Sequence, residues 1–165
     1  MSIDPRSGRT KGMVETHDYQ VEITSTGVKR GRLAAAADGL PELDVASPPE
    51  FGGPDGVWSP EHLFVASLAA CLMTTFRAIA ELSGVVVLEY DDRASGRLIR
   101  AEDRLYRIDR VTLRPEIVIA DPDQIERARR LLDKAERACL ISRSVDCQVE
   151  LEGSITADSR QSLSV

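Results

Sequence analysis

The spacing of hydrophobic and polar residues changes along this chain, and each change predicts a different secondary structure. From His17 onward apolar residues alternate with polar ones, as at Tyr19, Val21 and Ile23, and this period of two favours strands. Turn residues at 26–27 and 38–39 divide the region, so further strands are predicted over 28–36 and 43–46. Residues 47–57 contain three prolines and three glycines and predict a loop.

Two longer segments are typical of helices. Residues 63–82 are apolar on almost all sides, which predicts a helix buried on several faces. Ser59 can cap its first turn, Pro60 suits the first helical position, and Glu61 complements the positive helix end. Ser83-Gly84 ends this helix. The second predicted helix runs from about residue 122 to residue 139, and its apolar positions share one side: Ile125, Ala128, Leu131, Leu132, Ala135 and Ala138.

The remaining segments predict strands. Residues 85–90 and 106–120 are expected to form a hairpin with a polar turn at 94–96, and a last strand alternates from Val145 to Glu152. The predicted order is β-β-β-α-β-β-α-β, an α+β fold. A chain of 165 residues is long enough for one core, so we expect a single domain over residues 17–157, with flexible tails at 1–16 and 158–165.

Composition and charge narrow the classes of partner. The formal net charge is −6, and the basic residues cluster only at 29–32, which argues against nucleic acid. The first twelve residues lack the apolar stretch of a secretory signal. Arg77 and Glu81 would be costly inside a membrane span, so we predict no membrane partner and a cytoplasmic protein. Structural disulfides are rare in that compartment.

The cysteines are the candidate reactive groups. Cys71 lies within the first predicted helix, where position alone favours a small buried apolar residue, and Cys139 closes the second. Neither has the spacing of a Cys-x-x-Cys pair or a zinc site, and the two histidines lack ligand neighbours, so no metal is predicted. Cys71 is far from the positive end of its helix. A thiolate there is therefore expected to need a neighbouring cation.

Two segments carry a resemblance to a known family. Residues 59–71, Ser-Pro-Glu-His-Leu-Phe-Val-Ala-Ser-Leu-Ala-Ala-Cys, resemble the signature of the OsmC/Ohr family of thiol peroxidases. Residues 138–145, Ala-Cys-Leu-Ile-Ser-Arg-Ser-Val, resemble that family's second cysteine motif. The resemblance extends over roughly residues 21–155. It implies two central helices packed with antiparallel sheets in an intertwined homodimer.

The same resemblance implies a reaction. Cys71 would attack an organic or inorganic hydroperoxide, and Cys139 would resolve the resulting sulfenic acid as a disulfide. A dithiol such as a lipoyl group would then reduce that disulfide. The family's chemistry implies no metal, haem, flavin or other cofactor.

In that family a glutamate and an arginine organise the thiolate and the bound peroxide. Glu61 matches the glutamate, but ten residues of straight helix would place it about 15 Å from Cys71 along the axis. We therefore expect Glu61 to serve the Cys71 of a partner subunit. The arginine match is incomplete, because the ungapped position holds Lys29; Arg30 is the expected substitute, followed by Arg32.

This incomplete match leaves other hypotheses open. One is a non-catalytic OsmC-like dimer that binds a small apolar ligand or senses oxidants at its interface pocket. Another is a structural dimer whose cysteines only fill the core. Cys147 is expected to pack in the core, since its strand neighbours are apolar and the motif gives it no role, and Trp58 is expected at the rim of a pocket.

Overall fold

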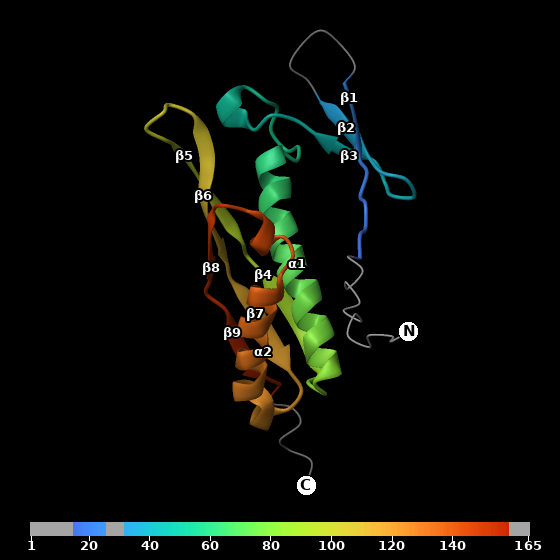
Figure 1. Cartoon of the computed structure of the whole chain (residues 1–165), viewed down its shortest axis with the longest axis vertical. Coiled ribbons are helices and arrows are strands. Elements are labelled where there is room, and N and C mark those ends of the chain that lie inside the picture. The colour runs from blue at the N-terminus through green and yellow to red at the C-terminus, as the bar shows by residue number, and fades with distance from the viewer. Residues whose placement is uncertain (1–14, 26–31, 159–165) are drawn as a thin grey trace, which may run out of the picture.

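The computed structural model describes residues 15–25 and 32–158 (Figure 1). Two α-helices, α1 (Pro60–Leu82) and α2 (Ile125–Ala138), pack against each other and against the strands. The α+β class and the two central helices are therefore confirmed. In the described part of the chain, nine strands form three sheets: β1 (Glu22–Ser25), β2 (Leu33–Ala36) and β3 (Leu43–Val45); β4 (Val87–Asp92), β7 (Pro115–Ile119) and β9 (Ser154–Ala157); β5 (Ser95–Arg100), β6 (Tyr106–Leu113) and β8 (Gln148–Leu151). Short 3₁₀ helices are η1 (Pro49–Phe51), η2 (Pro122–Gln124) and η3 (Ser142–Ser144).

The boundaries of α1 follow from its terminal residues. The Ser59 hydroxyl accepts a hydrogen bond from the backbone N–H of His62 (3.3 Å) and also contacts His62 Nδ1 (2.8 Å). Pro60 occupies the first helical position, where a missing N–H costs nothing. Gly84 adopts a φ of 69°, a left-handed conformation that glycine tolerates, and the helix stops before it. The predicted start and end of this helix are confirmed.

The core lies on one side of α1. Leu68, Leu72, Phe76 and Ala80 are fully buried there, opposite buried residues of α2 and the strands: Val85, Val111, Leu113, Ile117, Ile119, Ala128, Leu132, Ala135 and Ile155. Among the described residues α1 is the one helix with the length and composition to cross a membrane, and 22% of its apolar window is buried in this chain. The sequence predicted that this helix is buried on several faces. Within one chain, α1 is buried on one face.

The strands differ from the prediction in number and place. β5 begins within the segment predicted as a polar turn. The prediction missed this strand because it is exposed apart from Ile99 and shows no apolar alternation. The strand expected over 106–120 is two strands, because the chain leaves one sheet and enters another at Arg114. The last predicted strand is confirmed in its second half as β8, and β9 follows it as a further strand that was not predicted. The order is therefore β-β-β-α-β-β-β-β-α-β-β.

The last two strands pair in parallel with the two strands that precede α2. β8 pairs with β6 and β9 pairs with β7, and α2 lies in the connection between the two halves. Gly153 separates β8 from β9. A Cβ atom there would lie 2.8 Å from the end of the Leu132 side chain and 3.1 Å from the Pro115 ring, so a larger residue would require these side chains to shift.

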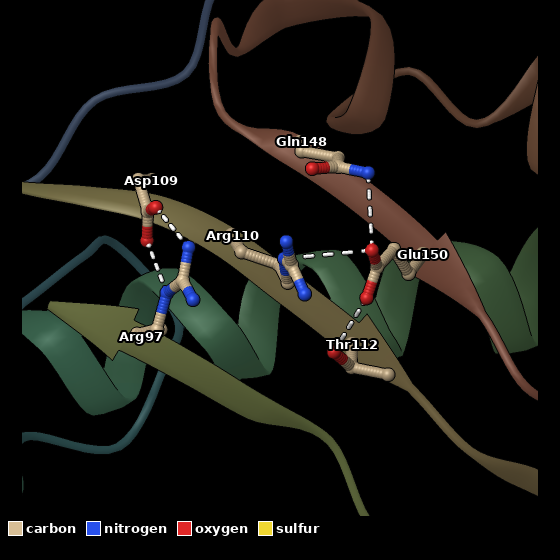
Figure 2. A network of polar contacts seen from close by, with 6 residues as sticks. All are labelled: Arg97, Asp109, Arg110, Thr112, Gln148 and Glu150. Atoms are coloured by element: carbon tan, nitrogen blue, oxygen red, sulfur yellow. Dashed lines mark hydrogen bonds and ion pairs between the residues drawn. The ribbon is translucent and has the colours of Figure 1, made fainter.

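Polar side chains tie together the sheet of β5, β6 and β8 (Figure 2). Arg97 on β5 forms a bidentate ion pair with Asp109 on β6. Glu150 on β8 accepts hydrogen bonds from Thr112 (3.4 Å) and Gln148 (3.0 Å) and lies 3.4 Å from Arg110. These contacts join neighbouring strands across the polar face of the sheet.

The N-terminal sheet of β1, β2 and β3 stands apart from the other two sheets, beside the N-terminal end of α1 (Figure 1). Its link to the rest of the chain includes a bridge between Val45 and Trp58, with a hydrogen bond from Ala46 N–H to the Trp58 carbonyl (2.8 Å). β1 is exposed over its full length. This sheet therefore extends from the body of the chain.

Candidate functional site

The packing of α1 on α2 brings two cysteines together. Cys71 lies half-buried near the middle of α1, and Cys139 is the fully buried residue that caps the C-terminal end of α2. Both are free thiols, and the Cys139 side chain hydrogen-bonds the Cys71 sulfur. Residues far apart in the sequence thus form one thiol pair.

The surroundings of Cys71 favour its thiolate. Burial raises the pKa of Cys71, but hydrogen bonds outweigh burial and leave this pKa below its ordinary value. The donors are the Cys139 thiol, the backbone N–H groups of Ile141 and Leu140, and the Thr75 hydroxyl. No basic side chain of the described residues contributes. Hydrogen bonds thus lower this pKa in the described part of the chain, and the expected cation stays a prediction because Lys29 and Arg30 lie outside that part.

Local geometry explains why these donors are free to point at Cys71. α2 ends at Ala138, and the chain turns through η3, where Arg143 N–H bonds the Cys139 carbonyl (3.2 Å) and Ser144 N–H bonds the Ile141 carbonyl (2.9 Å). The backbone N–H groups of Leu140 and Ile141, which precede these two, are left for the sulfur. Thr75 lies one turn after Cys71 on α1. That four-residue spacing was readable in the sequence, whereas the role of the backbone turn was not.

Cys139 has the opposite tendency. Burial raises the pKa of Cys139, the hydrogen bond and negative charge of Cys71 raise it further, and Ser142 offsets part of the effect. Of the pair, Cys71 therefore ionises first while Cys139 keeps its proton. A nucleophilic thiolate beside a protonated thiol can attack an electrophile and then be captured as a disulfide.

Two buried polar groups lie on β4, and the sequence analysis missed both. The Tyr90 ring packs on Phe76 with ring centroids 6.0 Å apart, and its buried hydroxyl has no hydrogen-bond partner among the described residues. Burial raises the pKa of Tyr90, as do the charges of Asp92 and Cys139, so the phenol stays protonated. Asp92 accepts a hydrogen bond from Arg114 N–H (2.8 Å), and burial raises its pKa.

Glu61 does not reach Cys71 within one chain. Because α1 is continuous from Pro60, the two residues are about 15 Å apart along the helix axis. Glu61 instead faces a cavity of about 980 Å³, with Trp58, Asp92 and Tyr106 also in its wall. One carboxylate oxygen of Glu61 is buried without a hydrogen-bond partner in the described structure.

The other predicted residues lie elsewhere. Lys29 and Arg30 fall outside the described residues, and Arg32 pairs with Asp44 (3.0 Å) rather than with the cysteines. Cys147 is half-buried and packs against the core; burial raises its pKa, and the charges of Asp109 and Asp146 add to the effect. Over residues 15–25 and 32–158, no group of three or more His, Cys, Asp or Glu side chains could hold a metal ion.

Comparisons with known proteins find relatives of this chain and of its fold. The uncharacterized protein YmaD of Bacillus subtilis (strain 168) is 27% identical over 139 residues, which cover 82% of this chain and 91% of that protein. An OsmC-like protein of unknown function from Vibrio cholerae O1 biovar eltor has a similar structure, with a TM-score of 0.77 and 22% identity over 84% of this chain and 100% of that one.

A structure described as an organic hydroperoxide resistance protein OsmC, from Legionella pneumophila, has a TM-score of 0.63 and 25% identity, covering 86% of this chain and 99% of that one. The family model of the OsmC-like proteins matches residues 53–153, which include both Cys71 and Cys139. This match spans more than half of the sequence. The chain therefore belongs to the OsmC-like protein family.

Proposed function

We propose that this protein is a cysteine-based peroxidase that reduces organic or inorganic hydroperoxides. The observation that carries the proposal is the thiol pair, in which hydrogen bonds lower the pKa of Cys71 while Cys139 stays protonated beside it. Similar structures named as organic hydroperoxide resistance proteins support a peroxide substrate. The cytoplasm, where thiols stay reduced, is the proposed compartment.

The proposed reaction has three steps. The Cys71 thiolate attacks the terminal oxygen of the O–O bond, forming a sulfenic acid, and the alkoxide leaves with a proton as an alcohol. The Cys139 thiol then attacks the Cys71 sulfur, forming a disulfide and releasing water. A dithiol, for which a lipoyl group is the proposed example, supplies two electrons and two protons and returns both cysteines to thiols.

We further propose that the working protein is a homodimer. The apolar α1 is buried along one face only, and the cavity at its N-terminal end contains the unpaired oxygen of Glu61. A second copy would cover the exposed remainder of α1 and bring its own Cys71 to Glu61. Arg30 remains the proposed cation of the assembled site.

The same cavity favours a second candidate function. Its wall is largely apolar and aromatic, with Phe51, Trp58 and Tyr106 among its residues, so a non-catalytic dimer could bind a small apolar ligand there. A ligand-binding protein of this kind would not need the hydrogen bonds that stabilise the Cys71 thiolate. We therefore rank it second.

Substitution of each cysteine tests the first proposal. Cys71→Ser should abolish consumption of cumene hydroperoxide with dithiothreitol as reductant, while circular dichroism shows a folded protein. Cys139→Ser should react once and accumulate a sulfenic acid that a dimedone probe labels. Equal single-turnover reactivity of wild type and Cys71→Ser would exclude the peroxidase and leave the ligand-binding candidate.

A further inference from the structure

One side of α2 carries basic side chains that take no part in the site described above. They recur at intervals of three and four residues, which places them along one side of the helix. All are exposed, and none has an ion-pair or hydrogen-bond partner among the described residues, whereas Arg129 pairs with Glu126 (2.7 Å). We name them the basic row: Arg127, Arg130, Lys134 and Arg137.

Basic residues outnumber acidic ones on α2. The helix carries five basic and three acidic residues in a chain whose net charge is −6. Asp133 and Glu136 line a shallow groove toward β8 and β9 together with Arg137, so acidic residues border one edge of the basic row. The basic row is thus a local positive surface on an acidic protein. Such a surface attracts negatively charged partners.

The row ends beside the thiol pair. Cys139 directly follows α2, Leu140 after it is 68% exposed, and the exposed Arg143 in η3 continues the positive surface. Figure 1 shows α2 lying beside the C-terminal half of α1 and leading into η3. Because Cys139 itself is fully buried, a reductant for a Cys71–Cys139 disulfide has to approach over the residues around it.

We propose that the basic row docks an acidic protein surface that carries the reducing dithiol. This inference rests on the peroxidase function proposed above and names its partner. One thiolate of the partner attacks the Cys71–Cys139 disulfide to give a mixed disulfide, and the partner's second thiol displaces it. Two electrons and two protons pass to the cysteines, and the partner leaves as a disulfide.

Two observations favour an acidic protein over other polyanions. A helix that binds a membrane surface exposes large apolar side chains beside its basic ones, but the apolar side of α2 packs into the core of this chain. The basic row spans about 15 Å of one helix, and a net charge of −6 opposes binding to a long nucleic acid. A compact acidic patch on a protein matches a surface of this size.

Reduction kinetics with defined dithiols test the proposal. The protein is first oxidised with hydroperoxide, and mass spectrometry confirms the Cys71–Cys139 disulfide. The probes are three synthetic peptides with one Cys-Gly-Pro-Cys centre flanked by Glu, Gln or Lys, together with dithiothreitol. At low ionic strength the Glu peptide should reduce the disulfide about tenfold faster than the Gln peptide, and the Lys peptide should be slowest. Added salt should remove these differences.

Charge reversal locates the effect. Arg130→Glu with Lys134→Glu should abolish the preference for the Glu peptide and leave the rate with dithiothreitol unchanged. The matched control, Arg93→Glu with Arg104→Glu, makes the same change of charge at exposed positions outside α2 and should retain the preference. Circular dichroism checks that each variant is folded.

The outcomes separate the two proposals. Equal rates with the Glu and Gln peptides, or a preference that survives substitution of the basic row, would overturn the docking surface while leaving the peroxidase intact. Failure of hydroperoxide to form the disulfide at all would overturn the peroxidase, and the docking proposal with it.

Discussion

The middle and the N-terminal end of α1 present two unlike chemical environments. In the middle, the Cys71 sulfur receives hydrogen bonds from α1, from the end of α2 and from the turn that follows, all within one chain. At the N-terminal end, Glu61 and Asp92 face a cavity, and each leaves one buried carboxylate oxygen without a hydrogen-bond partner in the described structure.

This difference indicates which part of the molecule is complete. An unpaired buried polar oxygen costs free energy, about 1–3 kcal/mol in typical proteins, so such groups normally find donors. The hydrogen bonds to the Cys71 sulfur all come from one chain. The buried carboxylate oxygens have no such donors in the described structure, and a second copy that covers the exposed face of α1 is the partner we propose to supply them.

The largest expected effect comes from mixing two inactive variants. If Glu61 serves the partner's thiol, a heterodimer of Glu61→Ala and Cys71→Ser chains keeps one intact site and loses the other. Peroxide turnover should then recover to about half of the wild-type value in the heterodimers, although both parent homodimers are inactive or nearly so. Turnover is measured after subunit exchange, with heterodimers counted by native mass spectrometry.

Absence of recovery in confirmed heterodimers would break the comparison, because it would show that Glu61 does not serve the partner's thiol. The control is a mixture of Glu61→Ala with wild type, in which activity should follow the number of intact sites.

A smaller effect is expected from one donor of the thiol pair. Thr75→Val keeps the size of the side chain but removes a hydroxyl that lowers the pKa of Cys71. The pKa should rise, so that less thiolate is present at neutral pH. Iodoacetamide alkylation and peroxide attack should slow about three- to tenfold at pH 6, as expected for one hydrogen bond of about 0.5–1.5 kcal/mol. The rate at pH 10 should change little, and Thr74→Val is the matched control.

Asp92, at the carboxylate end, should affect how the stability of the protein changes with pH. Burial raises the pKa of Asp92 above its value in the unfolded chain, so its contribution to stability is full below the unfolded pKa and is lost as pH rises through the folded one. Asp92→Asn keeps an oxygen for Arg114 N–H and removes the charge. It should raise the free energy of unfolding at pH 7 by less than about 1 kcal/mol after screening by solvent, and Tm with it, with no gain near pH 3. A lower Tm at pH 7 would reveal a cation paired with Asp92 in the assembled protein.

The smallest effect on activity is expected at the third cysteine. Burial and two aspartates raise the pKa of Cys147, so it should be alkylated more slowly than Cys71 at neutral pH. Cys147→Ala should leave peroxide turnover unchanged. If Cys147→Ala lost turnover as completely as Cys71→Ser, the assignment of Cys71 and Cys139 as the redox pair would be wrong.

The sequence predicted local structure where a physical signal was strong. The cap at Ser59, the proline at position 60 and the glycine at 84 fix α1, and the apolar side of α2 gave that helix within three residues at its start. β5 was missed because an exposed strand has no apolar alternation. The donors to Cys71 at 140–141 are backbone groups, which leave no trace in residue type. Their role emerges only when α1 and α2 pack together.

The parallel pairing of the last strands affects how the chain folds. β8 pairs with β6 across a connection that includes α2, so Arg110 lies opposite Gln148, a contact between distant parts of the sequence. Such contacts form late, because a long loop must close before they stabilise the fold. During synthesis Cys71 emerges from the ribosome well before Cys139 and the strands that hold it. An unfinished chain meeting peroxide therefore has a thiol without its resolving partner, and oxidation there can proceed past the sulfenic acid to irreversible forms.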